Sequence, residues 1–184
     1  MTKFRTKNSS PIKQGDVIRN VEMIENIKFD GKKVEIKRIV FPLSVVITQS
    51  CDLDGDYHYR WGKELSKTAN KKLLSLLMLP LYNAEHLLIG KHFENLGVEM
   101  NTNFSKEAKK CIEQNKDPRY HYLEFPAEIP VVPQIIDFKH YFTVNAEILK
   151  QKKKRDFVCQ IAELYREDLS LRFAGFLSRI GLPG

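Results

Sequence analysis

The sequence predicts an α+β protein that is mainly β and folds as one domain over residues 1–184. Three observations indicate this class. Short runs rich in β-branched residues alternate with turn residues through residue 83, which is typical of small antiparallel sheets. Residues 84–118 have helical character, and residues 161–181 carry apolar side chains at steps of three and four. A chain of 184 residues, 42% of them hydrophobic, is long enough to bury one core.

The first strands are expected to form a meander. Residues 1–10 are polar and are predicted to be flexible, and the first strand is predicted over residues 17–23. A turn signal at residues 29–32 leads into residues 33–40, where apolar and charged side chains alternate. Pro42 is expected to interrupt this ladder, because proline lacks the backbone donor, before a buried strand at residues 44–48.

The next stretch changes from apolar to polar within two residues. Residues 50–56 read Ser-Cys-Asp-Leu-Asp-Gly-Asp and are predicted to form a turn, followed by a loop with a helical turn near residues 64–67. Residues 72–79 are strongly apolar and end at Pro80. We expect them to form a second core strand, with a helix as the alternative.

The second half of the chain is predicted to mix helices and strands. Residues 84–118 form a helical insertion, in which Ser105 begins a short basic helix. Strands are expected at residues 119–123, 135–149 (one bent or two) and 157–161, with a basic hairpin or loop at residues 150–155. Gly181 and Pro183 are expected to end the last helix.

Composition restricts the function classes. No apolar run is long enough to cross a bilayer, and residues 1–11 do not resemble a signal peptide, so we expect a cytoplasmic protein without membrane contact. The three cysteines lack CxxC spacing, which disfavours a disulfide framework and a cysteine-rich zinc site. The net charge of +7 permits an anionic partner such as nucleic acid, although the excess charge is spread along the chain.

Cys51 and Asp52 form the first candidate site. A thiol beside a carboxylate is a weak candidate pair of metal ligands or a candidate nucleophile, which His58, His86 or His121 would complete. The alternative is that Cys51 is a small buried apolar residue in a solvated turn. We expect no bound cofactor.

Two clusters combine cationic and aromatic side chains, as phosphate contact and base stacking require. One is Arg119-Tyr120-His121-Tyr122, and the other spans residues 57–61 and includes His58, Arg60 and Trp61. The alternative is that the aromatic residues belong to the core and the charged residues to the surface. If the clusters meet in space, a nucleic-acid surface is favoured.

Four motifs, in their order and spacing, resemble the MazF/PemK-like family of SH3-like barrels, best known as toxins of toxin–antitoxin pairs. The resemblance covers residues 14–83 and 131–181, with residues 84–118 as an insertion that is atypical of the family. The motifs are Gln14-Gly15-Asp16-Val17-Ile18; Pro42-Leu43-Ser44-Val45-Val46-Ile47; Leu76-Leu77-Met78-Leu79-Pro80; and Ile136-Asp137-Phe138-Lys139 with a later helix ending at Ile180-Gly181.

The resemblance implies an SH3-like barrel with an inserted helical segment and a C-terminal amphipathic helix. Many family members cleave single-stranded RNA without a metal, using an arginine directly before the conserved proline and a serine or threonine after the second apolar strand. Such groups stabilise the phosphorane charge and position the phosphate. Here Phe41 precedes Pro42, and Leu81-Tyr82-Asn83 follows Pro80, so both catalytic groups are missing.

The resemblance therefore implies a divergent, nucleic-acid-interacting protein of bacterial or phage conflict, including phage defence. If it is a metal-independent endoribonuclease, Arg38 or Arg60 would contact the phosphate, His58 or His121 would move a proton, and Asp52 would orient the histidine. Predicted nucleic-acid contacts are Arg38, Arg119, Tyr120, Tyr122 and Trp61. The alternative is a non-catalytic module that binds a protein such as an antitoxin. Homodimer formation is a further expectation from the family.

Overall fold

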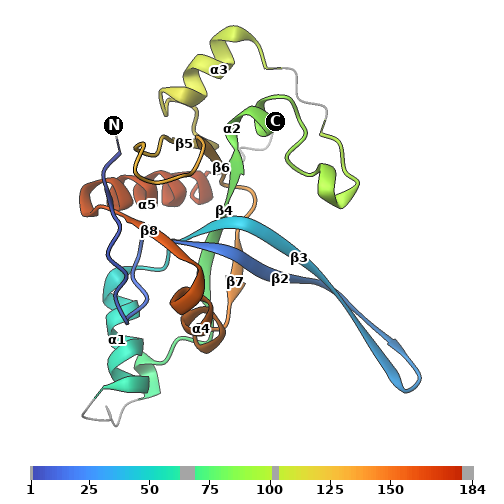
Figure 1. The fold of residues 1–184 in the computed structure, drawn as a ribbon, viewed down its shortest axis with the longest axis vertical. Coiled ribbons are helices and arrows are strands. Elements are labelled where there is room, and N and C mark those ends of the chain that lie inside the picture. Colours follow the sequence, from blue (N-terminus) through green and yellow to red (C-terminus); the bar gives the residue numbers. More distant parts are fainter. Residues whose placement is uncertain (1, 63–68, 101–103, 180–184) are drawn as a thin grey trace.

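A computed structural model describes residues 2–62, 69–100 and 104–179, and the fold is α+β (Figure 1). Eight antiparallel strands form one strongly curled sheet in the order β1-β8-β2-β3-β4-β6-β5, with β7 also paired to β4. The strands are β1 (Phe4–Arg5), β2 (Asp16–Asp30), β3 (Lys33–Val46), β4 (Leu76–Asn83), β5 (Tyr120–Leu123), β6 (Gln134–Asp137), β7 (Phe142–Val144) and β8 (Phe157–Ile161). The helices are α1 (Ser50–Trp61), α2 (Ala84–Leu88), α3 (Lys106–Glu113), α4 (Ala146–Asp156) and α5 (Glu163–Leu177), with 3-10 turns η1 (Ala69–Lys71) and η2 (Glu94–Leu96).

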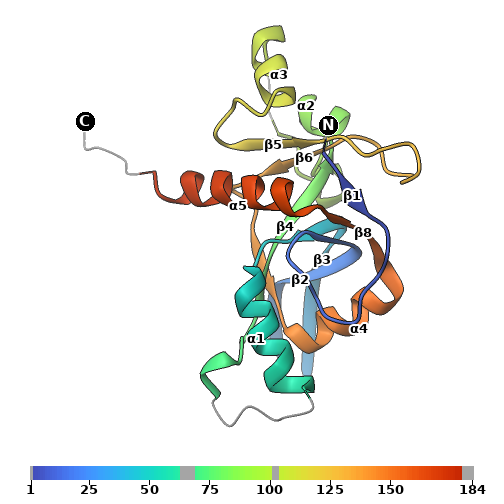
Figure 2. The ribbon, with the colours of Figure 1, turned by 90° about the vertical axis from the view of Figure 1, so that its left-hand side faces the viewer.

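Apolar side chains from the curled sheet form two buried clusters. One contains Val46 and Met78 of the central strands together with Leu149 of α4. The other contains Val45 and Leu79 and is covered by α5, whose apolar side chains include Phe173. The amphipathic helix predicted near the C-terminus therefore packs on the sheet (Figure 2). It begins at Glu163, and its predicted end at Gly181 and Pro183 lies outside the described residues.

The β2–β3 hairpin is longer than the sequence predicts. Pro42 does not interrupt β3, because it lies opposite Asn20, where the ladder has no paired position. Asn20 has a positive φ of 53°, which makes the strand irregular at that point. Proline is tolerated there because no ladder hydrogen bond needs its missing donor. The outer half of the hairpin projects from the body as a two-stranded ribbon (Figure 1).

The polar stretch after the buried strand is a helix and not the predicted turn. Residues 50–61 form α1, which buries Leu53 and Asp56. Asp56 and Arg60 lie one helical turn apart and form an ion pair of 2.8 Å. The short apolar face explains why periodicity did not reveal the helix. The helical turn predicted near residues 64–67 lies outside the described residues.

A second helix replaces the predicted basic loop at residues 150–155. Asn145 caps α4 by accepting from the backbone N–H of Glu147, and the predicted strand over residues 135–149 divides into β6, β7 and the start of α4. Lys153 lies on the buried face of α4 and pairs with Asp16 at 2.6 Å. The lysine-rich run is therefore compatible with a helix, because Asp16 pairs with its one buried charge and solvent accommodates the others.

The other predicted elements agree better with the observed helices and strands. The described parts of residues 84–118 contain only short helices, and Ser105 caps α3 by accepting from the N–H of Ala108 at 3.2 Å. Strands near residues 119–123 and 157–161 are confirmed as β5 and β8. The predicted strand over residues 72–79 is β4, which starts later and runs through Pro80. Residues 4 and 5, predicted to be flexible, pair with β8 as β1. Among the described helices, none is long and apolar enough to span a membrane.

Candidate functional site

The candidate catalytic residues do not come together. Asp52, His58 and Arg60 lie on α1, whereas His121 lies on β5, at the opposite end of the molecule (Figures 1 and 2). Asp52 and His58 are exposed. The structure therefore does not assemble the site that would pair His121 with an α1 carboxylate.

Arg60 has a structural role. Its side chain is 8% exposed, and Nε donates to both carboxylate oxygens of Asp56 at 2.8 Å. Its terminal nitrogens donate to Glu147 at 2.8 Å and to the carbonyl oxygen of Leu73 at 2.6 Å. These partners engage each nitrogen of the guanidinium. Arg60 therefore fixes α1 against the loop before β4 and is not free to hold a phosphate.

His121 is also buried in the fold. It is 4% exposed and stacks near Phe138. Burial, followed by the charge of Arg172, lowers the pKa of His121 to about 3, so the imidazole is neutral at physiological pH. A cavity beside it is lined by acidic residues that include Glu113, Glu124 and Asp168. The negative charge of these side chains disfavours binding of a phosphate group in this cavity.

The other residues of this cluster, Arg119 before β5 and Tyr120 and Tyr122 on it, match the alternative in which aromatic residues are core. Arg119 donates to Asp137 from Nε at 2.8 Å, and a second nitrogen contacts the other carboxylate oxygen. Tyr120 is buried and packs edge-on against Phe104. Tyr122 is half-buried, and its backbone N–H donates to Asn115 at 2.6 Å.

The remaining predicted residues are accessible but dispersed. Arg38 lies on the projecting ribbon and pairs with Glu22 at 3.2 Å. Trp61 lies at the end of α1, where the Lys150 ammonium is 3.4 Å from its ring centroid. Cys51 is exposed on the first turn of α1, with Sγ 3.9 Å from Asp52 Oδ1. In the described parts of the chain, no three His, Cys, Asp or Glu side chains gather to hold a metal ion.

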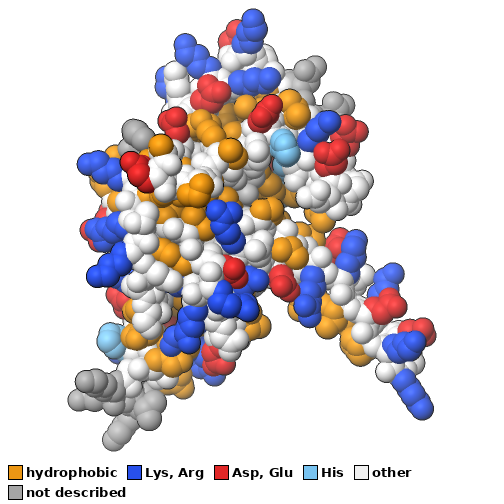
Figure 3. All heavy atoms as spheres, viewed as in Figure 1, with side chains coloured by type: hydrophobic (Ala, Val, Ile, Leu, Met, Phe, Trp, Pro, Cys, Tyr) orange, Lys and Arg blue, Asp and Glu red, His pale blue; other side chains and the backbone are white. Residues whose placement is uncertain are grey.

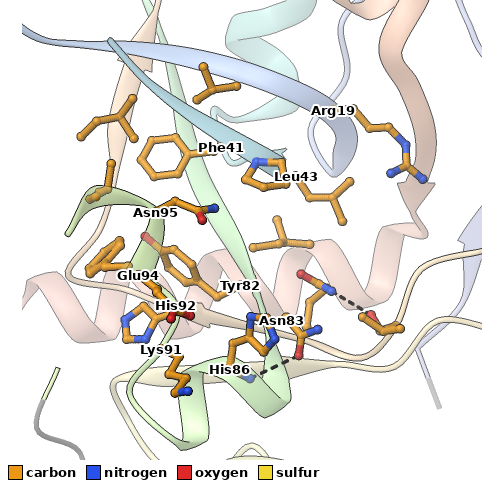
Figure 4. A pocket seen from close by; sticks show the side chains of 18 residues that line it. Arg19, Phe41, Leu43, Tyr82, Asn83, His86, Lys91, His92, Glu94 and Asn95 are labelled. Carbon is orange, nitrogen blue, oxygen red and sulfur yellow. Dashed lines mark hydrogen bonds between the residues drawn. The ribbon is translucent and has the colours of Figure 1, made fainter. Parts of the chain in front are cut away.

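A cavity of about 390 Å³ lies where β3 and β4 meet the segment after α2 (Figure 4). Sequence reasoning did not select it. Its lining includes residues 41–43 and 81–83, the two places where the family resemblance implies the catalytic groups. The insertion closes one side with residues 91–96. The cavity therefore lies between the central strands of the sheet and residues 91–96.

The cavity has aromatic walls. Phe41, Tyr82 and Phe93 line it, and Tyr82 packs edge-on against Phe93 with ring centroids 5.3 Å apart. Tyr82 is 6% exposed, yet its hydroxyl has no hydrogen-bond partner among the described residues. Burial, followed by the charge of Asp137, raises the pKa of Tyr82, so the hydroxyl keeps its proton. A buried hydroxyl without a partner costs free energy unless water or a ligand satisfies it.

Two histidines lie beside Tyr82. His92 lines the cavity, and neither of its ring nitrogens has a partner in the described structure. Burial, followed by the charge of His140, lowers the pKa of His92 to about 4. The ring centroids of His92 and His140 are 6.3 Å apart. A neutral imidazole offers one donor and one acceptor, so His92 adds unsatisfied polar atoms to an aromatic wall.

Cations flank these walls. Arg19 and Lys91 lie at opposite ends of the cavity, and His86 is near Lys91 (Figure 4). Asn83 is engaged in the fold, because its side-chain oxygen accepts from the N–H of Glu85 at 2.9 Å. Sequence reasoning missed this site because its residues come from four distant segments and share no spacing. The apolar run ending in Leu81-Tyr82 was the one available signal.

Comparisons with protein-family models, curated proteins and solved structures found no match for this chain. The fold and the cavity define the protein as an α+β protein with a ligand-sized, aromatic-walled pocket between two cations.

Proposed function

We propose that the protein binds single-stranded RNA in this pocket, as a divergent MazF/PemK-like SH3-like barrel. The observation that carries the proposal is the aromatic wall of Phe41, Tyr82 and Phe93, with unpaired polar atoms on Tyr82 and His92. The position of the pocket on β3 and β4 supports it, because Phe41-Pro42 and Leu81-Tyr82 occupy the places of the family's catalytic groups.

The chemistry of the pocket suits an unpaired base. Its volume of about 390 Å³ falls within the range of roughly 300–1,000 Å³ seen for small-ligand sites. Aromatic side chains stack on bases of any sequence, and the hydroxyl and imidazole reach base edges through hydrogen bonds. Arg19 and Lys91 would neutralise the flanking phosphates on either side.

Cleavage of the bound RNA is a second candidate function. The neutral imidazole of His92 is able to accept a proton, and Lys91, which lies at the same end of the cavity, is the cation able to stabilise charge on a phosphate. These residues would replace the candidate set of Arg60, His58 and His121. A non-catalytic protein-interaction module, with an antitoxin or another protein as partner, stays the alternative class.

The test measures the affinity of the whole protein for a fluorescently labelled, mixed-sequence single-stranded RNA by anisotropy, over a series of salt concentrations. We expect Arg19→Ala with Lys91→Ala to weaken binding at least about tenfold at low salt and to reduce the salt slope by about two. The matched control is Lys154→Ala with Arg155→Ala, which removes the same charges from α4, outside the pocket.

The control should change affinity less than about twofold. Equal losses in both double variants would mean that net charge alone drives binding, and absence of binding by the wild-type protein would overturn the proposal. Gel analysis of the same RNA after incubation, with His92→Gln as the comparison, reports on cleavage.

A further inference from the structure

The projecting part of the β2–β3 hairpin has one apolar face. In the ladder, Ile27 lies opposite Ile36, and Phe29 lies opposite Val34. Opposite residues of an antiparallel pair point to the same side of the sheet. Continuing toward the body, Ile24 and Val40 lie on this side too. We name these six side chains the arm strip: Ile24, Ile27, Phe29, Val34, Ile36 and Val40.

The opposite side of the arm is polar. It carries the pairs Asn26–Lys37, Lys28–Glu35 and Asp30–Lys33. Each member of the arm strip is exposed, from 43% for Ile27 to 78% for Phe29. Hydrophobic side chains are visible along the ribbon in Figure 3. The amphipathic pattern is that of a sheet with one face packed on a core, yet nothing in the described residues covers the strip.

A two-stranded ribbon whose apolar face is uncovered has little stability of its own. Beyond Ile18, β2 pairs only with β3, and β3 pairs with β4 only from Leu43 onward. An isolated two-stranded hairpin is marginally stable in water unless its apolar face packs on something else. The arm strip therefore needs a partner surface.

The strip is suited to a second copy of itself. With about 200 Å² for a large side chain, six half-exposed side chains leave roughly 600 Å² of apolar surface on each copy. Two copies would bury roughly 1,200 Å², the lower end of the range for specific interfaces. Arg38 and Glu22 lie on the same side of the arm as the strip, opposite Ile24 and Val40, and they pair with each other at 3.2 Å, so they add no net charge. Two strips therefore meet without charge repulsion, and a phosphate backbone finds little to bind there.

We propose that two copies of this chain associate through their arms, with the arm strips packed face to face and running antiparallel about a two-fold axis. This arrangement is the isologous interface expected of a symmetric dimer. It lays Phe29 of one copy over the root of the arm of the second copy, beside Val40. Val40 also lines the pocket described above, so the second copy would contribute a residue to the pocket's edge.

The test is the mass of the full chain in solution by sedimentation. Ile27→Thr with Ile36→Thr replaces the centre of the strip with β-branched polar residues that keep strand propensity. The matched control, Lys28→Thr with Glu35→Thr, alters the neighbouring cross-strand pair on the polar side. We expect the wild type and the control to dimerise at micromolar concentration, and the strip variant to have a dimer Kd at least about tenfold higher.

Raising the salt concentration separates this association from RNA binding. Apolar packing between two positively charged copies should strengthen with salt, whereas phosphate binding should weaken. A monomeric wild type at about 100 µM, far above the micromolar range of ordinary specific association, would overturn the proposal. So would a strip variant that dimerises as well as the control. Neither result bears on the RNA pocket.

Disulfide trapping tests the antiparallel orientation. In a background with Cys51→Ser and Cys111→Ser, which removes both exposed thiols, Phe29→Cys and Val40→Cys proteins are mixed and oxidised. We expect the mixed disulfide to form faster than either self-disulfide. Faster self-coupling of Phe29→Cys would contradict the antiparallel arrangement.

Discussion

At the scale of single residues, two predicted phosphate ligands differ in their surroundings. Arg60 is buried beside Asp56, whose side chain is 4% exposed, whereas Arg38 and Glu22 are exposed on the arm. The sequence shows the same residue type in both places. Only tertiary packing distinguishes a structural arginine from an accessible one, because Leu73 and Glu147 approach Arg60 from distant parts of the chain.

We predict that Arg60→Ala lowers the free energy of unfolding by about 3 kcal/mol, because it leaves the Asp56 carboxylate buried without its partner. The exposed counterpart, Arg38→Ala, should change it by less than about 1 kcal/mol. Urea denaturation measures both. RNA affinity per folded molecule should be unchanged in Arg60→Ala. A large loss of affinity with intact stability would restore Arg60 as a phosphate ligand.

The buried histidine makes stability depend on pH. The pKa of His121 is about 3 in the folded protein, below the value of about 6.5 for an exposed imidazole. The unfolded chain therefore binds the proton more readily, and His121 destabilises the fold as pH falls from 6.5 toward 3, by roughly 1.4 kcal/mol for each pH unit. We predict that His121→Gln flattens the decline measured by urea denaturation between pH 7 and 4. Equal slopes in the wild type and in His121→Gln would contradict this account.

At the scale of elements, pattern reasoning was reliable where one face is broad and apolar. Strand β8 and helix α5 were predicted close to their observed positions, and β2 and β3 were predicted in part, because their side chains repeat at steps of two or of three and four. Helices α1 and α4 were mistaken for a turn and a loop. Each buries only a few side chains, and each depends on a buried ion pair, Asp56–Arg60 or Lys153–Asp16, that no local pattern reveals.

Glycine substitutions test the helical assignment of residues 50–61. Gly55 lies inside α1, and an added Cβ would meet only the Lys71 side chain, at 3.9 Å. We predict that Gly55→Ala raises the free energy of unfolding by roughly 0.5–1 kcal/mol, because alanine favours the helix. Gly15→Ala should lower it, since Gly15 has a φ of +83° and an added Cβ would lie 3.0 Å from the Ile161 carbonyl oxygen. Thermal or urea unfolding measures both changes in the free energy of unfolding. Destabilisation by Gly55→Ala would indicate a turn at this position instead of a helix.

At the scale of the whole molecule, the candidate site depends on how the curled sheet joins distant segments. Tyr82 follows an apolar strand that the sequence indicates clearly, but His92 and His140 come from an insertion and from the loop after β6. Both are isolated histidines without partners at a regular spacing in the sequence. The curvature of the sheet and the path of residues 91–96 bring the two histidines beside Tyr82. Neither the curvature nor this path can be predicted from sequence spacing.

The two proposals, RNA binding in the pocket and association through the arm, predict opposite responses to salt. RNA binding should weaken steeply between 50 and 200 mM salt, because the release of counterions from the RNA becomes less favourable as the salt concentration rises. Association of two copies through the arm strip should persist or strengthen over the same range. Sedimentation with and without labelled RNA, at both salt concentrations, separates the two.

Photo-crosslinking of RNA that contains 4-thiouridine, followed by mass spectrometry of the crosslinked peptides, tests the central claim most directly. If an unpaired base stacks in the pocket, crosslinks will fall on residues 81–83 or 91–96, and Phe93→Ala will diminish them. Crosslinks confined to residues 57–61 on α1 or to residues 119–122 at the start of β5, with none at the pocket, would contradict it.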